Sequence, residues 1–222
     1  MKLHWRLLKT KNLNVPVSTI GKILKQEGLV RKYRKKKIKY KYIKAKRKPG
    51  ELVEIDVKHV PGRVLGRKYY QYTAIDTSSR WRHLEIFDEE TTTHSVKFLK
   101  IVINKFPYKI KATKTDNHST FTNYYLGTNK RSDMTVKTIH ALDKYCAMHN
   151  IIHYLIDKGS PTQNGTVERS HREDEEKFYQ KNNFNNVKKL KKEIRIWNKY
   201  YNDLEHCSLQ GKTPNDMLKI IN

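Results

Sequence analysis

Three strand patterns follow one another in the first half of this 222-residue chain, and they limit its possible folds more than any other feature. The first, at 52–57, alternates, so that its apolar residues share one face while Glu54 and Asp56 point the other way. The second, at 69–75, is aromatic and β-branched, and the third, at 81–87, alternates again. Because only short turns connect them, the three runs predict an antiparallel meander.

Downstream of the meander, helical and strand-like spacings of apolar residues take turns, and the last third of the chain is helical in pattern. We expect helices at 91–105, 133–149, 166–180 and 187–201. We expect strands at 110–115 and 151–156. Strands that are followed by alternating helices and strands predict an α/β fold with a mixed sheet flanked by helices.

Positive charge is concentrated at the N-terminal end. The chain has 47 Lys and Arg against 22 Asp and Glu, and residues 1–50 hold 18 of these cations with a single acid, Glu27. Residues 31–48 include 12 cations, no acid and three tyrosines, a density that resists compaction and predicts an extended arm. Cations beside tyrosines suit phosphate contact and base stacking, so we expect a nucleic-acid partner; a solvated tail without a partner is the alternative.

Ahead of the arm, residues 17–28 predict a short helix. Ser18 is a suitable N-cap, and Gly28 lies where a left-handed C-terminal stop is expected. With the apolar residues before it, this helix fits part of a helix-turn-helix in which Lys22 contacts DNA. It fits an amphipathic helix packed on the core equally well.

Composition argues against several classes of protein. No window approaches the run of about eighteen apolar residues that a membrane span requires, and the opening MKLHWRLLK is too charged for a signal peptide. The two cysteines, Cys146 and Cys207, cannot form a disulfide framework, and no CxxC exists for a zinc knuckle. We therefore expect a chain that works in a reducing cytoplasm and contacts no membrane.

Three carboxylates occupy positions that favour chemistry. Asp56 is inside a predicted strand, Asp116 ends the strand at 110–115, and Glu168 lies near the start of a predicted helix. These positions can converge in a mixed sheet, where three carboxylates repel one another unless a cation such as Mg²⁺ or Mn²⁺ binds. Taken singly, each has a structural explanation: a lysine partner for Asp56, a turn for Asp116 and a favourable helix terminus for Glu168.

The sequence blocks around these acids resemble those of a known family. They read Pro49-Gly-Glu-Leu-Val-Glu-Ile-Asp-Val-Lys, Thr115-Asp-Asn and Ser160-Pro-Thr-Gln-Asn-Gly-Thr-Val-Glu-Arg-Ser-His-Arg. In this order they are similar to the catalytic blocks of bacterial insertion-sequence transposases with an integrase core, which belong with retroviral integrases among the DDE recombinases. The resemblance covers about residues 15–218, and its third block is the most specific.

The resemblance implies an RNase H-like core, a mixed five-stranded sheet flanked by helices, preceded by a helix-turn-helix remnant. The expected segments are the partial helix-turn-helix at 1–30, the basic linker arm at 31–49, the catalytic core at 50–182 and a C-terminal helical segment at 183–222. It also implies that Asp56, Asp116 and Glu168 are catalytic and hold Mg²⁺ or Mn²⁺. The implied reaction cleaves DNA at the element's terminal repeats and transfers the 3′ ends into target DNA.

DNA contacts are expected on the helix-turn-helix, along the arm and beside the third acid. The candidate residues are Lys22, Arg31, Arg34, Lys35, Lys36, Lys37, Arg169 and Arg172. The resemblance further implies a homo-oligomer on DNA, associated with the bacterial nucleoid, with terminal repeats and target DNA as its partners.

The sequence departs from the family pattern near the second acid. His118 stands where a glycine is usual, and 51 residues separate Asp116 from Glu168, more than is typical, with the excess expected around 123–135. The helix-turn-helix region is also shorter than usual. A truncated or inactive transposase-derived DNA-binding protein, such as a repressor, is therefore one alternative, and a basic structural RNA-binding protein is another.

The predicted helix at 166–180 carries further acids, at 173–176. Glu175 is seven residues beyond Glu168 and lies on nearly the same face, about 10 Å further along the axis at ~1.5 Å per residue. Two catalytic metals sit only about 3.5 to 4 Å apart, so one helix cannot present both acids to them. The spacing, together with the family-like block, selects Glu168.

Overall fold

A computed structural model describes residues 2–30, 46–123 and 138–219. The chain forms two compact units. One consists of Met1–Lys46 with Asp203–Asn222, and the other of Arg47–Asn202. Within the described ranges, none of the helices has the length and hydrophobicity of a membrane span.

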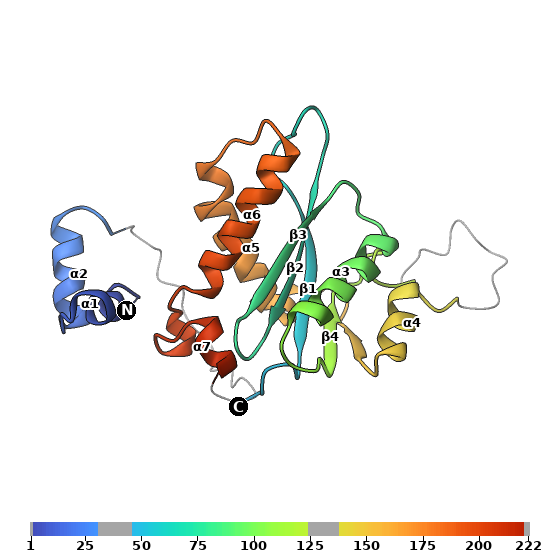
Figure 1. Ribbon diagram of the computed structural model, residues 1–222, viewed down its shortest axis with the longest axis horizontal. Coiled ribbons are helices and arrows are strands. Elements are labelled where there is room, and N and C mark those ends of the chain that lie inside the picture. The colour runs from blue at the N-terminus through green and yellow to red at the C-terminus, as the bar shows by residue number, and fades with distance from the viewer. Residues whose placement is uncertain (1, 31–45, 124–137, 220–222) are drawn as a thin grey trace. The chain divides into compact units, whose positions relative to one another are not determined.

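The larger unit is built on a five-stranded mixed sheet (Figure 1). β1 (Val53–His59), β2 (Tyr70–Asp76) and β3 (Arg82–Phe87) form an antiparallel meander. β4 (Ala112–Thr115) then pairs parallel to β1, and β5 (Ile152–Leu155) pairs parallel to β4, which gives the order β3-β2-β1-β4-β5. The predicted meander and mixed sheet are confirmed.

Helices cover both faces of this sheet. α3 (Thr92–Lys105) and α4 (Ala141–Met148) lie on one face, and α5 (Gly165–Lys177) and α6 (Val187–Asn202) lie on the other (Figure 1). The helix predicted at 133–149 is wrong at its start within the described residues: α4 begins only at Ala141, because the side chain of His140 accepts a hydrogen bond from the Leu142 backbone N–H and caps it. The rest of the predicted start, 133–137, lies outside the described residues.

A hydrophobic cluster joins α6 to the sheet. Leu190 and Ile194, one turn apart on α6, pack with Leu84 and Ile86 of β3 and with Phe178 at the end of α5. All five are buried. The side of this helix that carries Leu190 and Ile194 therefore faces the sheet, and α6 belongs to the same unit as the strands, although the sequence assigned residues from 183 onward to a C-terminal segment.

The smaller unit contains α1 (Lys2–Lys11), α2 (Val17–Gln26) and α7 (Pro214–Lys219). His4 Nδ1 donates to the Val15 carbonyl at 2.7 Å, which ties α1 to the residues before α2. The Ser18 cap is wrong, because the helix already begins at Val17 and Pro16, with φ −55° and ψ 140°, occupies the N-cap position. Gly28 has φ +66°, the left-handed conformation predicted for it.

Candidate active site

The first turn of α5 is held by a carboxylate from the sheet. Glu54 of β1 is buried, and its Oε2 accepts hydrogen bonds from the backbone N–H groups of Thr166 at 2.9 Å and Val167 at 3.0 Å. The first N–H groups of a helix have no partner within the helix, and a carboxylate also suits the positive end of the helix dipole. Glu54 therefore fixes the helix start, and the adjacent Glu168, against β1.

Asp56 and Lys58 share the face of β1 that Glu54 occupies, and both meet the same helix. Lys58 Nζ lies 2.7 Å from Glu175 Oε2, and Asp56 Oδ2 lies 3.5 Å from His171 Nδ1. The other ring nitrogen of His171 is 2.9 Å from Thr73 Oγ1, on the neighbouring strand. The alternation predicted for residues 52–57 thus separates a buried apolar face from a polar face that is covered by α5.

Asp56 is the most perturbed carboxyl of the site. Burial raises its pKa from 3.8 to about 7, repulsion by Asp116 and then by Glu168 and Glu90 adds to the rise, and a hydrogen bond from the Val57 N–H opposes it. The three acids predicted from the sequence are thus near enough to act on one another electrostatically. Over the part of the chain that the structure describes, however, no three His, Cys, Asp or Glu side chains are arranged to hold a metal ion.

His171 contributes no positive charge to this region at neutral pH. Burial lowers its pKa to about 4, Asp174 opposes the change, and the nearby cations Lys58 and Arg82 strengthen it. Its contact with Asp56 is therefore made by a neutral imidazole, which leaves the negative charge of the carboxylates uncompensated.

The residues after β4 form a turn around the second acid. Asp116 Oδ1 accepts from the backbone N–H of His118 at 3.1 Å, a short-range bond typical of aspartate in turns. The imidazole of His118, at the position where the resemblance implies a glycine, lies 3.2 Å from Glu90 Oε1 and 2.5 Å from Thr120 Oγ1. His118 is not among the residues with positive φ, so the turn accepts a side chain without backbone strain.

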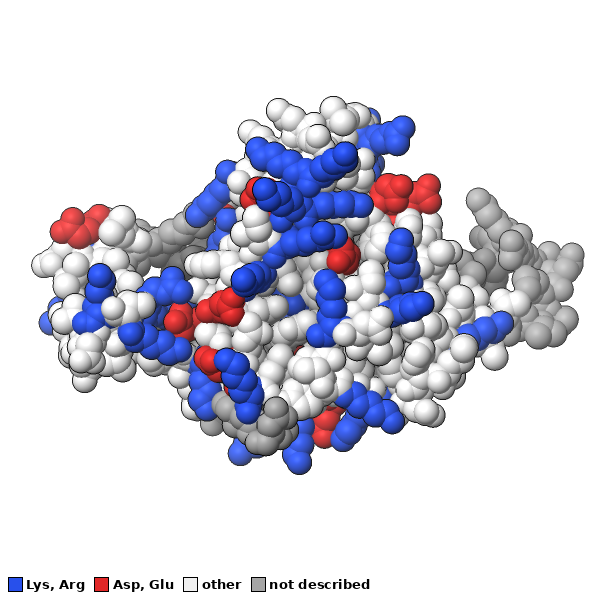
Figure 2. Space-filling model, in the orientation of Figure 1, with Lys and Arg blue, Asp and Glu red and all other residues white. Residues whose placement is uncertain are grey.

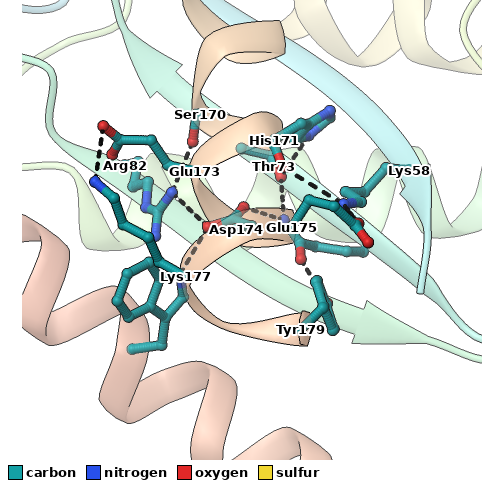
Figure 3. Close-up of polar contacts among 12 residues, drawn as sticks. Lys58, Thr73, Arg82, Ser170, His171, Glu173, Asp174, Glu175, Lys177 and Tyr179 are labelled. Carbon is teal, nitrogen blue, oxygen red and sulfur yellow. Dashed lines mark hydrogen bonds and ion pairs between the residues drawn. The ribbon is translucent and has the colours of Figure 1, made fainter. Parts of the chain in front are cut away.

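A buried ion pair anchors the middle of α5 (Figure 3). Arg82 Nη1 lies 2.8 Å from Asp174 Oδ1, and both side chains are 0% exposed. Trp197 Nε1 donates to Asp174 Oδ1 at 2.6 Å, Gln71 Nε2 donates to Oδ2 at 2.7 Å, and Arg82 also donates to Ser170 Oγ at 2.7 Å. Because β2, β3 and α6 all supply partners, this network fixes the rotation of α5 about its axis.

Two further acids of α5 also have structural partners. Glu173 forms an i,i+4 pair with Lys177 at 3.3 Å, and Glu175 is engaged by Lys58. Glu168, in contrast, is exposed in the first turn and forms no ion pair with another described residue.

Two family models, both described as integrase core domain, match residues 46–161 and 149–214. This chain belongs to the integrase core family. It is 28% identical over 190 residues to a protein described as "Putative integrase ORF3" of Spiroplasma virus SpV1-C74, a match that covers 82% of this chain and 51% of the relative. The chain therefore spans about half the length of that curated relative.

Solved integrase structures share the fold. The catalytic core of BIV integrase matches with a TM-score of 0.55 at 17% identity, over 78% of this chain and 95% of that one. The HTLV-2 integrase catalytic core in complex with magnesium (dimeric form) matches with a TM-score of 0.53 at 19% identity, over 77% of this chain and 97% of that one. A chain of the simian T-cell lymphotropic virus intasome in complex with PP2A regulatory subunit B56 gamma matches with a TM-score of 0.59 at 16% identity, over 96% of this chain and 73% of that one. The RNase H-like fold is thereby confirmed.

The candidate DNA contacts of this integrase core are dispersed. Arg169 and Arg172 are exposed on α5 beside Glu168, and Lys22 is exposed on α2 in the other unit. The arm candidates, Arg31, Arg34, Lys35, Lys36 and Lys37, lie outside the described residues.

Three residues around the acids were not found from the sequence: Glu54, Glu90 and His171. Glu54 had a signal, because it shares the polar face of its strand with Asp56. Glu90 becomes a neighbour of the acids, and His171 a neighbour of Asp56, only through contacts between distant segments, for which the sequence carries no local pattern.

Proposed function

We propose that this integrase core is a DDE transposase or integrase that cleaves a DNA strand and transfers its 3′ end, with Asp56, Asp116 and Glu168 as its catalytic residues. The observation that carries the proposal is the placement of three acids on β1, directly after β4 and in the first turn of α5, where Asp116 and Glu168 both repel the buried Asp56 and help to raise its pKa. Such a concentration of negative charge is the environment that a hard divalent cation relieves. The proposed substrates are the terminal repeats of an insertion sequence and its target DNA, acted on by a homo-oligomer.

The donor set fits Mg²⁺ or Mn²⁺, because it consists of carboxylate oxygens with no soft ligand. We assign the ion to Asp56, Asp116 and Glu168. When bound, it would activate the attacking oxygen and stabilise charge on the phosphodiester. The magnesium complex of the HTLV-2 integrase core supports this assignment.

The protein's own contribution is to hold the acids in place. Asp56 is fixed in the sheet, where Asp56 Oδ1 accepts from the Val57 N–H at 2.9 Å. Glu168 is positioned from two directions, by Glu54 at the start of α5 and by the Arg82–Asp174 pair within it. Contacts of this kind limit how far Asp56 and Glu168 must move when an ion binds.

Of the acids on α5, only Glu168 is proposed as catalytic. We predict that Glu168→Gln abolishes Mg²⁺-dependent strand transfer on a pre-cleaved duplex made from the DNA that flanks the coding sequence, while DNA binding persists. Glu175→Gln should retain most activity, because it removes only a partly exposed pair with Lys58. The reverse order of activities would refute the assignment.

A readout other than activity tests the metal site. Because the ion binds the folded chain, millimolar Mg²⁺ should raise the Tm of wild type and of Glu175→Gln by mass action, and should raise that of Asp116→Asn less. An equal rise in all three proteins would remove the proposed ion from these acids.

One observation favours a second candidate, a transposase-derived DNA-binding protein without cleavage: in the described residues no three acids are arranged around one ion. Strand transfer by wild type that is lost in Glu168→Gln would exclude this candidate, whereas DNA binding without strand transfer in Mg²⁺ and in Mn²⁺ would favour it.

A further inference from the structure

The outer face of α6 carries a stripe of cations, called here the α6 stripe. It consists of the exposed residues Lys188, Lys191, Lys192, Arg195 and Lys199. At 3.6 residues per turn these five positions fall within about 100° of the helix circumference, opposite the side that packs on the sheet. Figure 2 shows Lys and Arg side chains gathered over the region that α6 occupies in Figure 1.

The fold itself does not neutralise this charge. Arg195 has a distant acidic neighbour, Glu85, at 4.0 Å, but Glu85 is shared with Lys105 at 3.9 Å. None of the four lysines of the stripe forms an ion pair with any residue that the structure describes. Like charges at i,i+4 spacing destabilise a helix, so the stripe is unfavourable until an anionic partner covers it.

The dimensions of the stripe fit a nucleic-acid backbone. From residue 188 to residue 199 the helix extends about 16 Å at ~1.5 Å per residue. One strand of duplex DNA presents a phosphate about every 3.4 Å, so this length spans roughly five phosphates. Ile196 and Tyr200, 54% and 47% exposed, border one edge of the stripe and can contact sugars or bases.

A lipid surface fits less well. An amphipathic helix that binds a membrane inserts its apolar face, but the apolar face of α6, with Leu190 and Ile194, is already buried against the sheet. The exposed side of α6 is mainly charged, with Ile196 and Tyr200 at its edge, which favours a partner that is recognised through its phosphates.

We propose that the α6 stripe is a binding surface for the phosphate backbone of duplex DNA, separate from both the carboxylates and the N-terminal arm. This inference rests on the proposed function for its partner, DNA. α6 packs on β3, an edge strand two positions away from β1, so DNA on the stripe lies beside the catalytic acids and not over them. Contacts to phosphates carry no sequence information, so the surface suits a duplex of any sequence.

The test compares two variants with the same change in net charge. One carries Lys188→Gln, Lys191→Gln, Lys192→Gln and Lys199→Gln. The control carries glutamine at four exposed lysines on or near α3 and α4, namely Lys97, Lys100, Lys109 and Lys144. Binding of a random-sequence duplex to the full chain is measured by fluorescence anisotropy between 50 and 200 mM KCl, in EDTA.

We expect the stripe variant to lower the slope of log Kd against log [KCl] by about 3 to 4, since each lost phosphate contact removes about one unit. At 100 mM KCl its affinity should be at least about tenfold weaker than that of the control, which should stay near wild type. If the two variants lose affinity and slope equally, the effect is one of net charge and the proposal fails. The chelator removes catalysis from the measurement, so its outcome is independent of the strand-transfer assay.

A second measurement on the wild-type chain covers the case in which the stripe variant is unfolded. Lysine acetylation is measured with and without the duplex. The duplex should protect the four stripe lysines from acetylation more than the four control lysines. Equal protection of both sets would overturn the proposal. Vesicles containing phosphatidylserine provide the last comparison. If the stripe variant loses vesicle binding but keeps DNA binding, the partner is a membrane and the proposal is wrong.

Discussion

Among individual residues, Asp56 is the one whose charge the fold opposes most strongly. Its pKa is 3.8 in an ordinary setting and about 7 in the folded chain, because burial and the neighbouring acids disfavour the ionised form. Between pH 3.8 and about pH 7, Asp56 is therefore protonated more often in the folded chain than in the unfolded chain. The stability that this group contributes is therefore fully present below pH 3.8 and is lost as the pH rises through 7.

Asp56→Asn should remove this pH dependence. Asparagine keeps the oxygen that accepts the Val57 N–H but never ionises. In EDTA, the stability of the variant relative to wild type should increase by about 2 to 3 kcal/mol from pH 5 to pH 8, which denaturant unfolding at both pH values measures. Asp88→Asn, a change of an exposed acid, serves as the control. A difference between Asp56→Asn and wild type that is the same at both pH values would contradict the explanation.

The three acids were predicted to lie together because each stands in a recognisable block, and in the structure Asp116 and Glu168 act electrostatically on Asp56; their catalytic role stays a prediction. The residues that support them were harder to predict. Glu90 contacts His118 and Thr120, which come 28 and 30 residues later in the chain, and its own surroundings, Asp88-Glu89-Glu90, resemble an ordinary solvated acidic turn.

Among the secondary-structure elements, α5 depends most on polar contacts made inside the protein. Removing one member of its buried Arg82–Asp174 pair leaves the other charged and without compensation. We expect Asp174→Ala to lower the free energy of unfolding by about 3 to 5 kcal/mol, measured by urea denaturation. Glu173→Ala, which breaks a partly exposed pair with Lys177, should cost less than about 1 kcal/mol. Equal losses would show that the pair does not anchor the helix.

The strands were predicted more accurately than the helix ends. Alternation and β-branched residues placed β1, β2 and β3 to within a residue or two, because period-two patterning directly records which side is buried. Helical spacing alone did not reveal where α4 begins, since Ile139 continues the apolar pattern although it is 65% exposed and lies before the cap. The six-residue α7 was too short to produce a pattern.

At the scale of the whole molecule, the charge of +25 is concentrated in two regions, the arm and the α6 stripe. If residues 31–48 neutralise about six to ten phosphates, DNA affinity should fall about 10³- to 10⁵-fold between 50 and 200 mM salt. Deletion of 31–48 should flatten this dependence while the Tm of the core is unchanged. An unaltered slope would exclude the arm from binding.

If the arm and the stripe act separately, their effects on binding free energy should add. Combining the deletion of 31–48 with the four stripe substitutions should give the sum of the two individual losses of binding free energy.

The fold and family of the whole chain were predictable because the three blocks occur in order. The division into units was not, since Asp203–Asn222 joins the N-terminal helices through contacts such as Arg6 with Glu205, at 3.3 Å, which connect opposite ends of the sequence.

The hydrogen bonds from Thr166 and Val167 to Glu54 affect how much the segment between the second and third acids can vary in length among related chains. They connect the start of α5 directly to β1, so these contacts, and not the number of residues between Asp116 and Thr166, set the position of Glu168 relative to Asp56. Insertions and deletions between Asp116 and Thr166 that leave α4 and β5 intact are therefore tolerable without displacing the third acid. In searches for relatives, a glutamate two positions before the first aspartate is a better criterion than the spacing between the second and third acids.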